Sequence, residues 1–492
     1  MRKLFLTQQR LYTIATIGYV IAILLVMLFG YWKIQTDDSY IYYSYASNLA
    51  NGDGYVFNIG EKINATTSPL YTVILAISTW ILQYFHFFKI PLIGHVIGIT
   101  SLFFICLFFM EIFKTEEFHL FPFVLPLCFL LSPLLSNSVG METFLAMMLA
   151  MMCLYLYWRG KLLAASLVCS FTVLARPDML LLGIVIVVYD LIRNHRFPTL
   201  SMSLSFVIPI LVWLLFNYFY FGNFLPTSLI GKLSQTQSGR WGSGLIFLKG
   251  LISPSVWHSN TYRVAVFIAS LCGLVILGIK YKMWRVLQHP VLHIILLWNV
   301  VYLTIYGFIL NPPSYYWYYT PLALGFALLM TLPIEAIYRF ISKKTRVNKT
   351  VTISLLSSYL LLICLQLPVF FLTGSVTGKY ISNKFAAEWL NENVRTGSSV
   401  GAYEIGVLRY YYKNGPIIDG AGLVTPEVAE HLGQHDYSWF VLSYSPDYLV
   451  FNYPNRPILE SMVDSDWFQE DYSLLTILDA PNRQFAIYER QN

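Results

Sequence analysis

Charged residues are scarce in this sequence of 492 amino acids. Asp, Glu, Lys and Arg make up 12% of it, whereas 57% of the residues are hydrophobic and the mean hydropathy is +0.58. A soluble domain carries about 25% charged residues, so a water-soluble globular fold is excluded. The composition predicts a polytopic α-helical membrane protein.

Several other features are missing. The six cysteines all fall within apolar runs, so no disulfide framework is predicted. The C-terminal region has neither a Gly-rich phosphate loop nor the Cys/His spacing of a metal site. No internal repeat is visible. These absences leave the membrane part as the place to look for function.

Twelve apolar runs are candidates for membrane helices. They cover residues 11–32, 68–88, 90–113, 118–138, 144–158, 162–175, 179–192, 206–221, 264–279, 291–310, 321–337 and 351–372. The first run is too long for a signal-peptide core and no small-residue cleavage pattern follows it, so we expect a retained first span.

The distribution of charge predicts the orientation. Lys and Arg gather in short loops, at residues 2–10, 159–161, 193–196, 280–285 and 339–349, which the positive-inside rule places in the cytoplasm. From residue 374 onward, eight Lys and Arg stand against fifteen Asp and Glu, a net charge of −7, while the preceding part carries +13. The acidic C-terminal region is therefore expected outside.

This orientation predicts two parts of the chain. Residues 1–373 form a membrane domain with an outer loop at 33–67, in which an amphipathic surface helix at about 39–50 ends at Asn51-Gly52-Asp53-Gly54. Residues 374–492 form an outer α/β domain, with a helix at 384–394 and strands at 399–403, 416–419, 448–452, 474–478 and 484–488.

One of the twelve apolar runs cannot cross the membrane if this orientation holds. Asp37-Asp38 and Gly140-Met141-Glu142-Thr143 both fall outside, yet three apolar runs separate them. One of the runs 68–88, 90–113 and 118–138 therefore does not cross, which leaves about eleven transmembrane helices. The sequence leaves open which of the three it is.

Acidic residues gather on the predicted outer side. Of the eleven in the membrane part, six fall there: Asp37, Asp38, Asp53, Glu61, Glu142 and Asp178. Charged groups close to hydrocarbon are costly, at about 2.5–3.5 kcal/mol each on insertion scales, and usually mark a polar site. Arg176 and Lys232 fall on the same side.

This set of side chains suits sugar transfer from a phosphate. A carboxylate, Asp37 or Asp38, can be the base for an attacking hydroxyl, and Arg176 and Lys232 can bind a phosphate leaving group. The alternatives are an Arg176–Asp178 ion pair that closes a helix hairpin and an exposed loop lysine. Tyr316 and Tyr318, in a dense aromatic stretch, would stack on a sugar or belong to an interfacial belt.

A metal requirement is also left open. Asp37, Asp38 and Glu142 are oxygen ligands of the type that Mg²⁺ and Ca²⁺ prefer, but the sequence defines no geometry for them. No nucleic-acid partner is expected.

Five segments in order resemble a known superfamily. They are DDSYIYYSYASNLANGDGYVFNIGE…TTSPLYT, GMETFLAMML, LARPDMLLL, YFGNFLPTS…K and SYYWYYTPLALGFALL. This order is similar to that of the GT-C integral-membrane glycosyltransferases, which use polyprenyl-phosphate sugars. The similarity is greatest to the cell-wall terminal arabinofuranosyltransferase type, and protein O-mannosyltransferases and lipid A aminoarabinose transferases are more distant.

The resemblance implies site residues and a reaction. The family's catalytic acid motif falls on Asp37 and Asp38, and Glu142 and Arg176 match other residues of its outer site. Within the acidic pair we expect Asp37 to be the general base and Asp38 to position the acceptor or a metal. The chain departs from the family pattern at Asn223 and at Pro226-Thr227-Ser228, which puts the sugar specificity in doubt but not the reaction class.

The sequence thus predicts an inverting glycosyltransferase of a bacterial cytoplasmic membrane. It would transfer a sugar from a polyprenyl-phosphate donor to an outer acceptor, which is a glycan, a glycolipid or a protein. An ion-coupled transporter with an outer accessory domain is the alternative, since carriers also contain acids and an arginine. Carriers usually show internal repeats with charges at mid-membrane, however, and this chain shows neither.

Overall fold

The computed structural model describes residues 34–85, 89–114, 120–240, 244–257, 260–278, 289–343 and 376–491, with a few isolated positions besides. The predicted first and last spans, residues 11–32 and 351–372, and the basic loop 280–285 lie outside these ranges.

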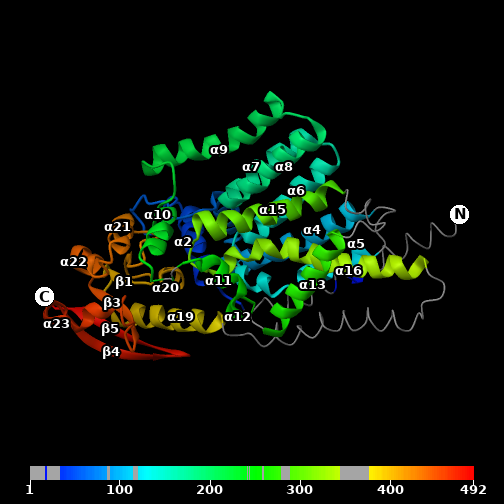
Figure 1. The fold of residues 1–492 in the computed structure, drawn as a ribbon. Coiled ribbons are helices and arrows are strands. Elements are labelled where there is room, and N and C mark those ends of the chain that lie inside the picture. The colour runs from blue at the N-terminus through cyan, green and yellow to red at the C-terminus, as the bar shows by residue number, and fades with distance from the viewer. Residues whose placement is uncertain are drawn as a thin grey trace.

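Every predicted apolar run in the described part of the chain forms a helix, and the helices gather in an elongated bundle (Figure 1). They are α3 (Pro69–Leu82), α4 (Ile90–Phe113), α5 (Phe121–Leu130), α6 (Thr143–Trp158), α7 (Leu162–Ala175), α8 (Leu180–Asn194), α9 (Leu200–Phe221), α13 (Asn260–Gly278), α15 (Pro290–Thr304) and α16 (Ala323–Lys343). In this part of the chain, four helical segments are long and apolar enough to cross a membrane: Ile90–Phe113, Leu200–Phe221, Pro290–Leu310 and Tyr316–Tyr338. The predicted polytopic helical fold is confirmed.

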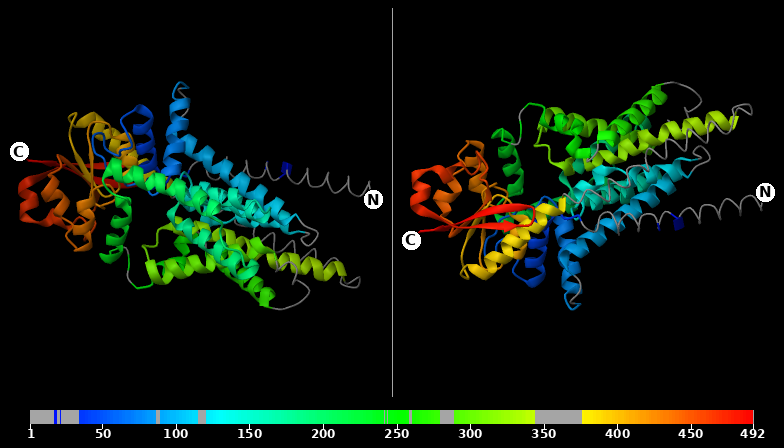
Figure 2. Two further views of the ribbon diagram at one scale, coloured as in Figure 1. Left: turned by 90° about the horizontal axis from the view of Figure 1, so that it is seen from above. Right: turned by 90° about the horizontal axis from the view of Figure 1, so that it is seen from below.

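Helix length does not identify the run that does not cross. Helix α4 has 24 residues, which is enough for a bilayer. Helices α3 and α5 have 14 and 10 residues, or about 21 and 15 Å at 1.5 Å per residue, against a hydrocarbon core of about 30 Å. Helix α7, which the predicted topology requires to cross, is as short as α3. Helix α3 and the beginning of α4 project sideways from the bundle in both views of Figure 2.

Shorter elements connect the bundle helices. They are the 3₁₀ helices η2 (Pro133–Ser138), η3 (Pro177–Met179), η5 (Tyr316–Tyr318) and η6 (Thr320–Leu322), the π-helical turn η4 (Ile305–Leu310), and the helices α10 (Thr227–Gln237), α11 (Ile246–Ile252) and α12 (Pro254–Trp257). The bundle core is a continuous apolar cluster that includes Phe109, Phe129, Met147, Trp298 and Leu328.

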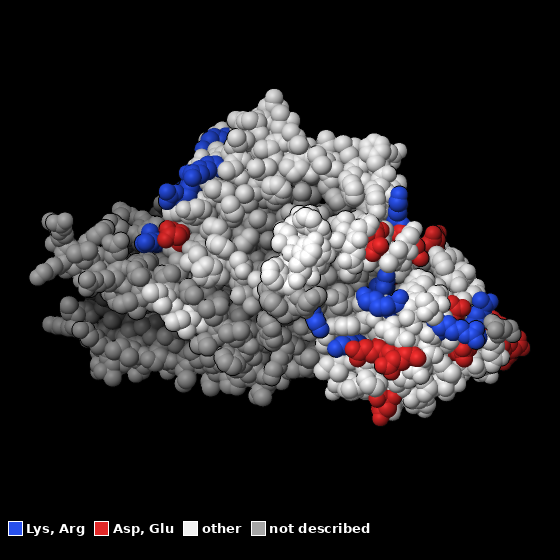
Figure 3. Space-filling model, turned by 180° about the vertical axis from the view of Figure 1, so that it is seen from behind, with Lys and Arg blue, Asp and Glu red and all other residues white. Residues whose placement is uncertain are grey.

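Among the described residues, charged side chains gather on the C-terminal domain and on the opposite part of the bundle in the view of Figure 3, and few lie between them. The basic loop residues Arg159, Lys161, Arg193 and Arg196 are exposed at the end remote from the C-terminal domain. A surface with few charges between two charged parts is expected of a chain that crosses a bilayer.

The C-terminal domain is an α/β unit at the other end (Figure 1). Its five-stranded sheet has the order β2-β1-β3-β5-β4, with β1 parallel to β2 and β3 and with β5 antiparallel to β3 and β4. The strands are β1 (Val400–Ala402), β2 (Ile417–Asp419), β3 (Tyr448–Tyr453), β4 (Tyr472–Ala480) and β5 (Arg483–Arg490). The helices are α19 (Val376–Asn393), α20 (Gly406–Tyr411), α21 (Pro426–Gly433), α22 (Trp439–Tyr444), α23 (Asp466–Asp471) and the 3₁₀ helix η7 (Ser461–Asp464). All five predicted strands are present.

The helix of the outer loop is α2 (Asp37–Asn51), and it ends where the sequence predicts. Gly52 adopts φ +89°, and its N–H bonds back to the carbonyls of Asn48 and Leu49, as at many helix ends. The expectation of a surface helix was wrong, because nine of its residues are buried. Ile41 and Tyr45 share an apolar core with the C-terminal domain, so α2 joins the two parts of the molecule.

Candidate active site

Helix α2 presents its two aspartates at its N-terminal end, where carboxylates interact favourably with the helix dipole. The two side chains have different surroundings. The Asp37 carboxylate accepts hydrogen bonds from the backbone N–H groups of Gly406 (3.1 Å) and Val407 (2.9 Å) at the start of α20. Among the described residues, the Asp38 carboxylate makes no hydrogen bond and lines a cavity.

A tight turn before α6 places Glu142. Gly140 has φ +78°, and its carbonyl accepts hydrogen bonds from the hydroxyls of Tyr43 (2.9 Å) and Tyr71 (2.7 Å). A Cβ at Gly140 would lie 2.6 Å from the Tyr43 oxygen, so both the conformation and the space require glycine here. Glu142 follows at the N-cap of α6 and is buried.

Arg176 lies where α7 ends. The residue before a proline avoids the helical conformation, and Arg176 is extended, with φ −155°. Its side chain, 4% exposed, donates from Nε and Nη2 to the Asp178 carboxylate at 3.0 and 2.7 Å. Its Nη1 donates to Thr143 Oγ1 at 2.7 Å and lies 3.5 Å from Glu142 Oε1. The predicted Arg176–Asp178 ion pair is therefore present.

Lys232 extends from α10 toward the aromatic stretch. Its Nζ lies 5.6 Å from the ring centroid of Trp317 and 5.5 Å from that of Tyr318, within cation–π range. Among the residues that the structure describes, Lys232 forms no ion pair within 4 Å. Lys232 is half-buried, so the alternative interpretation as an exposed loop lysine is wrong. It is a cation without a partner carboxylate among the described residues.

These residues meet around one cavity of about 140 Å³. Of the eight residues predicted from sequence, six line it: Asp38, Glu142, Arg176, Asp178, Lys232 and Tyr318. They come from α2, the turn before α6, η3, α10 and η5, so segments separated by up to 280 residues converge. The cavity lies at the end of the bundle that faces the C-terminal domain, which contributes Leu423 to its wall.

The cavity contains polar atoms that the protein itself does not satisfy. Glu142 Oε2 and Ser228 Oγ are buried and have no hydrogen-bond partner among the described residues. The Asp38 carboxylate faces the same space, again without a hydrogen bond from the described residues. Buried polar groups are nearly always satisfied, so this cluster is arranged for a polar ligand.

The surroundings of Asp38 change its acidity. Burial raises its pKa to about 6, and the nearby Lys232 opposes this rise. A carboxyl group with a pKa close to neutrality can accept a proton at physiological pH and hold it better than an exposed aspartate does.

Two of the predicted residues do not reach the cavity. The Asp37 carboxylate is directed at α20, and Tyr316 is exposed and outside the cavity lining. The other two outer acids, Asp53 and Glu61, are also exposed and take no part.

Sequence reasoning missed several contributors. Tyr302 and Tyr306 donate hydrogen bonds to Asp178 Oδ2 at 3.2 and 2.9 Å, from a helix with no motif of its own. Ser228 lies in the segment whose departure from the family pattern was visible, but that departure did not reveal its position. Leu423 could be assigned only from the tertiary structure.

In the part of the chain that the structure describes, no three His, Cys, Asp or Glu side chains form a metal-binding group. The set suggested by sequence, Asp37, Asp38 and Glu142, is divided because Asp37 is directed at α20. A divalent-cation requirement stays a prediction.

Comparison with known proteins concerns the fold. The profile of a domain of unknown function, DUF8728, matches residues 378–489. No curated protein sequence matches the chain.

Solved structures resemble nearly the whole chain. ArnT from Cupriavidus metallidurans bound to undecaprenyl phosphate matches with a TM-score of 0.57 and 12% identity, over 97% of this chain and 98% of that one. The oligosaccharyltransferase of Archaeoglobus fulgidus, tethered to an acceptor peptide with an NVT sequon, matches with a TM-score of 0.55 and 12% identity, over 98% and 74%.

The chain therefore has the fold of the GT-C glycosyltransferases, as the resemblance in sequence implied. The similarity to the arabinofuranosyltransferase type stays a prediction. The fold and the apolar helices make it a multi-pass membrane protein.

Proposed function

We propose that this protein is an inverting glycosyltransferase that transfers a sugar from a polyprenyl-phosphate donor to an acceptor on the outer side of a bacterial cytoplasmic membrane. One observation carries the proposal. The Asp38 carboxylate and a buried Glu142 oxygen, neither with a hydrogen-bond partner among the described residues, line one cavity together with the cations of Lys232 and Arg176. A base, hydrogen-bonding groups and phosphate ligands are the components that this reaction needs.

Asp38 is the general base in this proposal. An acceptor hydroxyl gives its proton to Asp38 while its oxygen forms a bond to the anomeric carbon of the sugar. The bond from that carbon to the phosphate oxygen breaks, and the phosphate keeps the electron pair. Attack from the face opposite the phosphate inverts the anomeric centre. The roles within the acidic pair are thus the reverse of those suggested by sequence, because Asp37 is bonded to α20.

Lys232 is the first phosphate ligand. It is a cation without a carboxylate partner among the described residues, and the rings of Trp317 and Tyr318 hold its amine at the cavity. Arg176 is already bonded to Asp178 and Thr143, so it adds positive potential and positions Glu142. Glu142 Oε2 then accepts a hydrogen bond from a sugar hydroxyl, and the Ser228 hydroxyl donates one to the sugar or accepts one from it.

A lipid-linked donor suits the position of the cavity. Apolar residues, Ile41, Met141 and Leu229, line it beside the charged ones, and Leu229 is 42% exposed. The phosphate and sugar would occupy the cavity while the polyprenyl chain leaves toward the membrane. The similar fold of ArnT, solved with undecaprenyl phosphate, supports this donor class.

The C-terminal domain borders the acceptor side, because Leu423 forms part of the cavity wall. A glycan, a glycolipid or a protein remains the acceptor class. The terminal arabinofuranosyltransferase resemblance favours an acceptor in the cell wall and a pentofuranosyl donor.

The test is consumption of donor by purified protein in nanodiscs. With a polyprenyl-phosphate sugar radiolabelled in the sugar, we expect release of polyprenyl phosphate and loss of label from the lipid. Lys232→Gln should weaken the apparent affinity for the donor. Lys384→Gln, at a half-buried position of the C-terminal domain where the lysine pairs with Glu388, serves as the matched control. An ion-coupled transporter would move label across proteoliposomes and leave the sugar–phosphate bond intact, which would refute the proposal.

A further inference from the structure

A second, larger cavity lies among α6, α7, α8 and α9. It shares no lining residue with the first, although Leu180 at one of its ends follows two residues after Asp178 of the first cavity. Its volume is about 360 Å³, within the range of ligand pockets. Its walls are almost entirely apolar, with Leu162, Ile184, Val187, Phe206 and Val207 among the lining residues. The candidate active site does not use it.

The groove lies mainly in one half of two of the helices that form it. On α7 its lining extends from Leu162, the first residue, to Cys169 at the middle of the helix, and on α6 it comprises Cys153 and Tyr157 in the second half. It narrows toward Leu180 at the start of α8, because α7 and α8 approach closely there: a Cβ on Gly183 would lie 3.0 Å from Cys169 Sγ. A chain about as long as one leaflet is deep therefore fits the groove better than a longer one.

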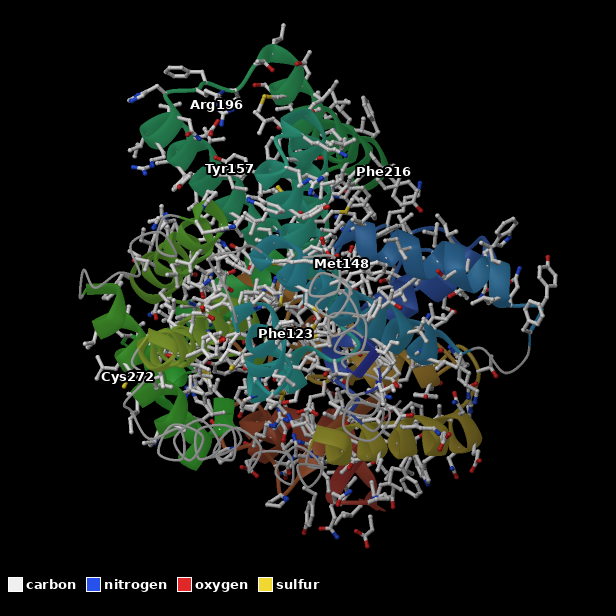
Figure 4. The ribbon with its side chains drawn as sticks, turned by 90° about the vertical axis from the view of Figure 1, so that its right-hand side faces the viewer. Phe123, Met148, Tyr157, Arg196, Phe216 and Cys272 are labelled. Carbon is white, nitrogen blue, oxygen red and sulfur yellow. The ribbon has the colours of Figure 1, made fainter. Side chains whose placement is uncertain are left out.

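The opposite end of the groove is polar and basic. Asp190 Oδ1 accepts hydrogen bonds from Tyr157 (2.8 Å), Asn194 (2.6 Å) and Arg196 Nη2 (3.0 Å). The Arg196 side chain is 53% exposed, and its bond to Asp190 uses one of the five N–H groups of a guanidinium. In Figure 4, which views this end of the molecule, Tyr157 and Arg196 lie close together on the side where α9 packs.

We propose that this groove is a binding site for an anionic glycerophospholipid of the bilayer leaflet remote from the C-terminal domain. One acyl chain lies between α7, α8 and α9, and the phosphate bonds to Arg196, which Asp190 and Tyr157 hold in place. Basic pockets between transmembrane helices bind anionic head groups by this charge complementarity. Exposed Arg159, Lys161 and Arg193 surround the same end and add attractive potential.

A phospholipid suits the groove better than the polyprenyl donor does. The groove lies mainly in one half of α6 and α7, whereas a polyprenyl chain is longer than one leaflet is deep. The candidate active site also lies at the other end of the bundle, because Glu142 and Arg176 stand at the ends of α6 and α7 opposite to Tyr157 and Leu162. A donor phosphate at Arg196 would thus be far from Asp38.

Native mass spectrometry of the purified full-length protein tests the proposal. Titration with phosphatidylglycerol should show tighter binding than titration with phosphatidylethanolamine. Arg196→Gln should weaken phosphatidylglycerol binding about fivefold, the effect of one basic side chain at a lipid head group. Its control, Arg193→Gln, removes the same unit of charge from an exposed arginine outside the groove lining and should weaken binding less than Arg196→Gln does.

A second pair of variants tests the chain-binding part. Ser166→Phe fills the groove and should remove retained lipid, whereas Ala164→Phe, on the exposed side of the same helix, should not. If Ser166→Phe does not fold, the Arg196 comparison decides. Equal binding of both phospholipids, unchanged affinity in Arg196→Gln, or displacement of phosphatidylglycerol by polyprenyl phosphate would overturn the assignment.

Discussion

Two adjacent aspartates in one helical turn have different environments in this protein. Asp37 accepts two backbone hydrogen bonds from α20, whereas Asp38 is directed into a cavity beside Lys232 and Glu142. Successive residues of a helix point about 100° apart, so a helix held between two structures necessarily gives neighbours different roles. One carboxylate is bonded to the C-terminal domain, and the other is left unbonded.

Asp38→Asn should remove most sugar transfer. Loss of a general base costs on the order of 10²–10⁴ in rate. Asp37→Asn is the matched control, and we expect it to lower stability by about 0.5–2 kcal/mol, as the loss of a helix-capping side chain does, with a smaller effect on turnover. Turnover of labelled donor and thermal unfolding of both variants would check this. Full activity in Asp38→Asn would refute its role.

The pH dependence of transfer should follow Asp38. Because its pKa is about 6, kcat/KM should fall about tenfold per pH unit below pH 6 and level off above it. Stability changes with pH in the opposite direction to the rate. Between pH 3.8, the ordinary pKa of an aspartate, and pH 6, folded Asp38 keeps a proton that the unfolded chain has lost. The free energy of unfolding therefore falls as the pH rises through this range. A pH–rate profile that is flat from pH 5 to 8 would contradict the assignment.

At the scale of elements, α2 and α10 connect the bundle to the C-terminal domain. Gly406 at the start of α20 touches α2 so closely that a Cβ would lie near the backbone oxygen of Asp37. Gly231 on α10 also lies against the backbone of the C-terminal domain, because a Cβ added there would lie 2.6 Å from the carbonyl oxygen of Gly422. The active-site helices are thus positioned by backbone contact with the domain, and only glycine allows that approach.

Gly406→Ala should therefore separate α2 from α20 and reduce transfer without any change to a cavity side chain. Gly378→Ala is the control, because the nearest atom to its Cβ would be 3.6 Å away, an ordinary contact. Limited proteolysis should show a looser C-terminal domain in Gly406→Ala alone, with a parallel loss of donor turnover. Wild-type turnover and protection in Gly406→Ala would show that the contact does not position the site.

At the scale of the whole molecule, basic loops and the C-terminal domain occupy opposite ends of the bundle (Figures 1 and 3). The candidate active site lies at the end with the domain. From the positive-inside rule we expect this end to face out of the cell. A lipid-linked donor that faces outward requires this orientation.

Cysteine labelling checks the orientation in intact cells. In a Cys272→Ser background, which removes the exposed native thiol among the described residues, Ser443→Cys in the C-terminal domain should react with an impermeant thiol reagent. Ser201→Cys, at the end with the basic loops, should react only after permeabilisation. Both positions are exposed. The reverse pattern would place the cavity in the cytoplasm and exclude an outward-facing donor.

The sequence by itself determined the membrane class, the helices in the described part and the five outer strands, because each follows from local composition and periodicity. It also selected six of the residues that line the cavity, since a charge next to hydrocarbon requires a reason.

The tertiary structure decided what each of these residues does. Asp37 and Asp38 are adjacent residues of the same type, so the local sequence does not distinguish their roles. The hydrogen bonds that α20 donates to Asp37 do. Tyr302, Tyr306, Ser228 and Leu423 join the site through contacts between segments far apart in the chain. Such contacts depend on how the helices pack, which no short stretch of sequence encodes.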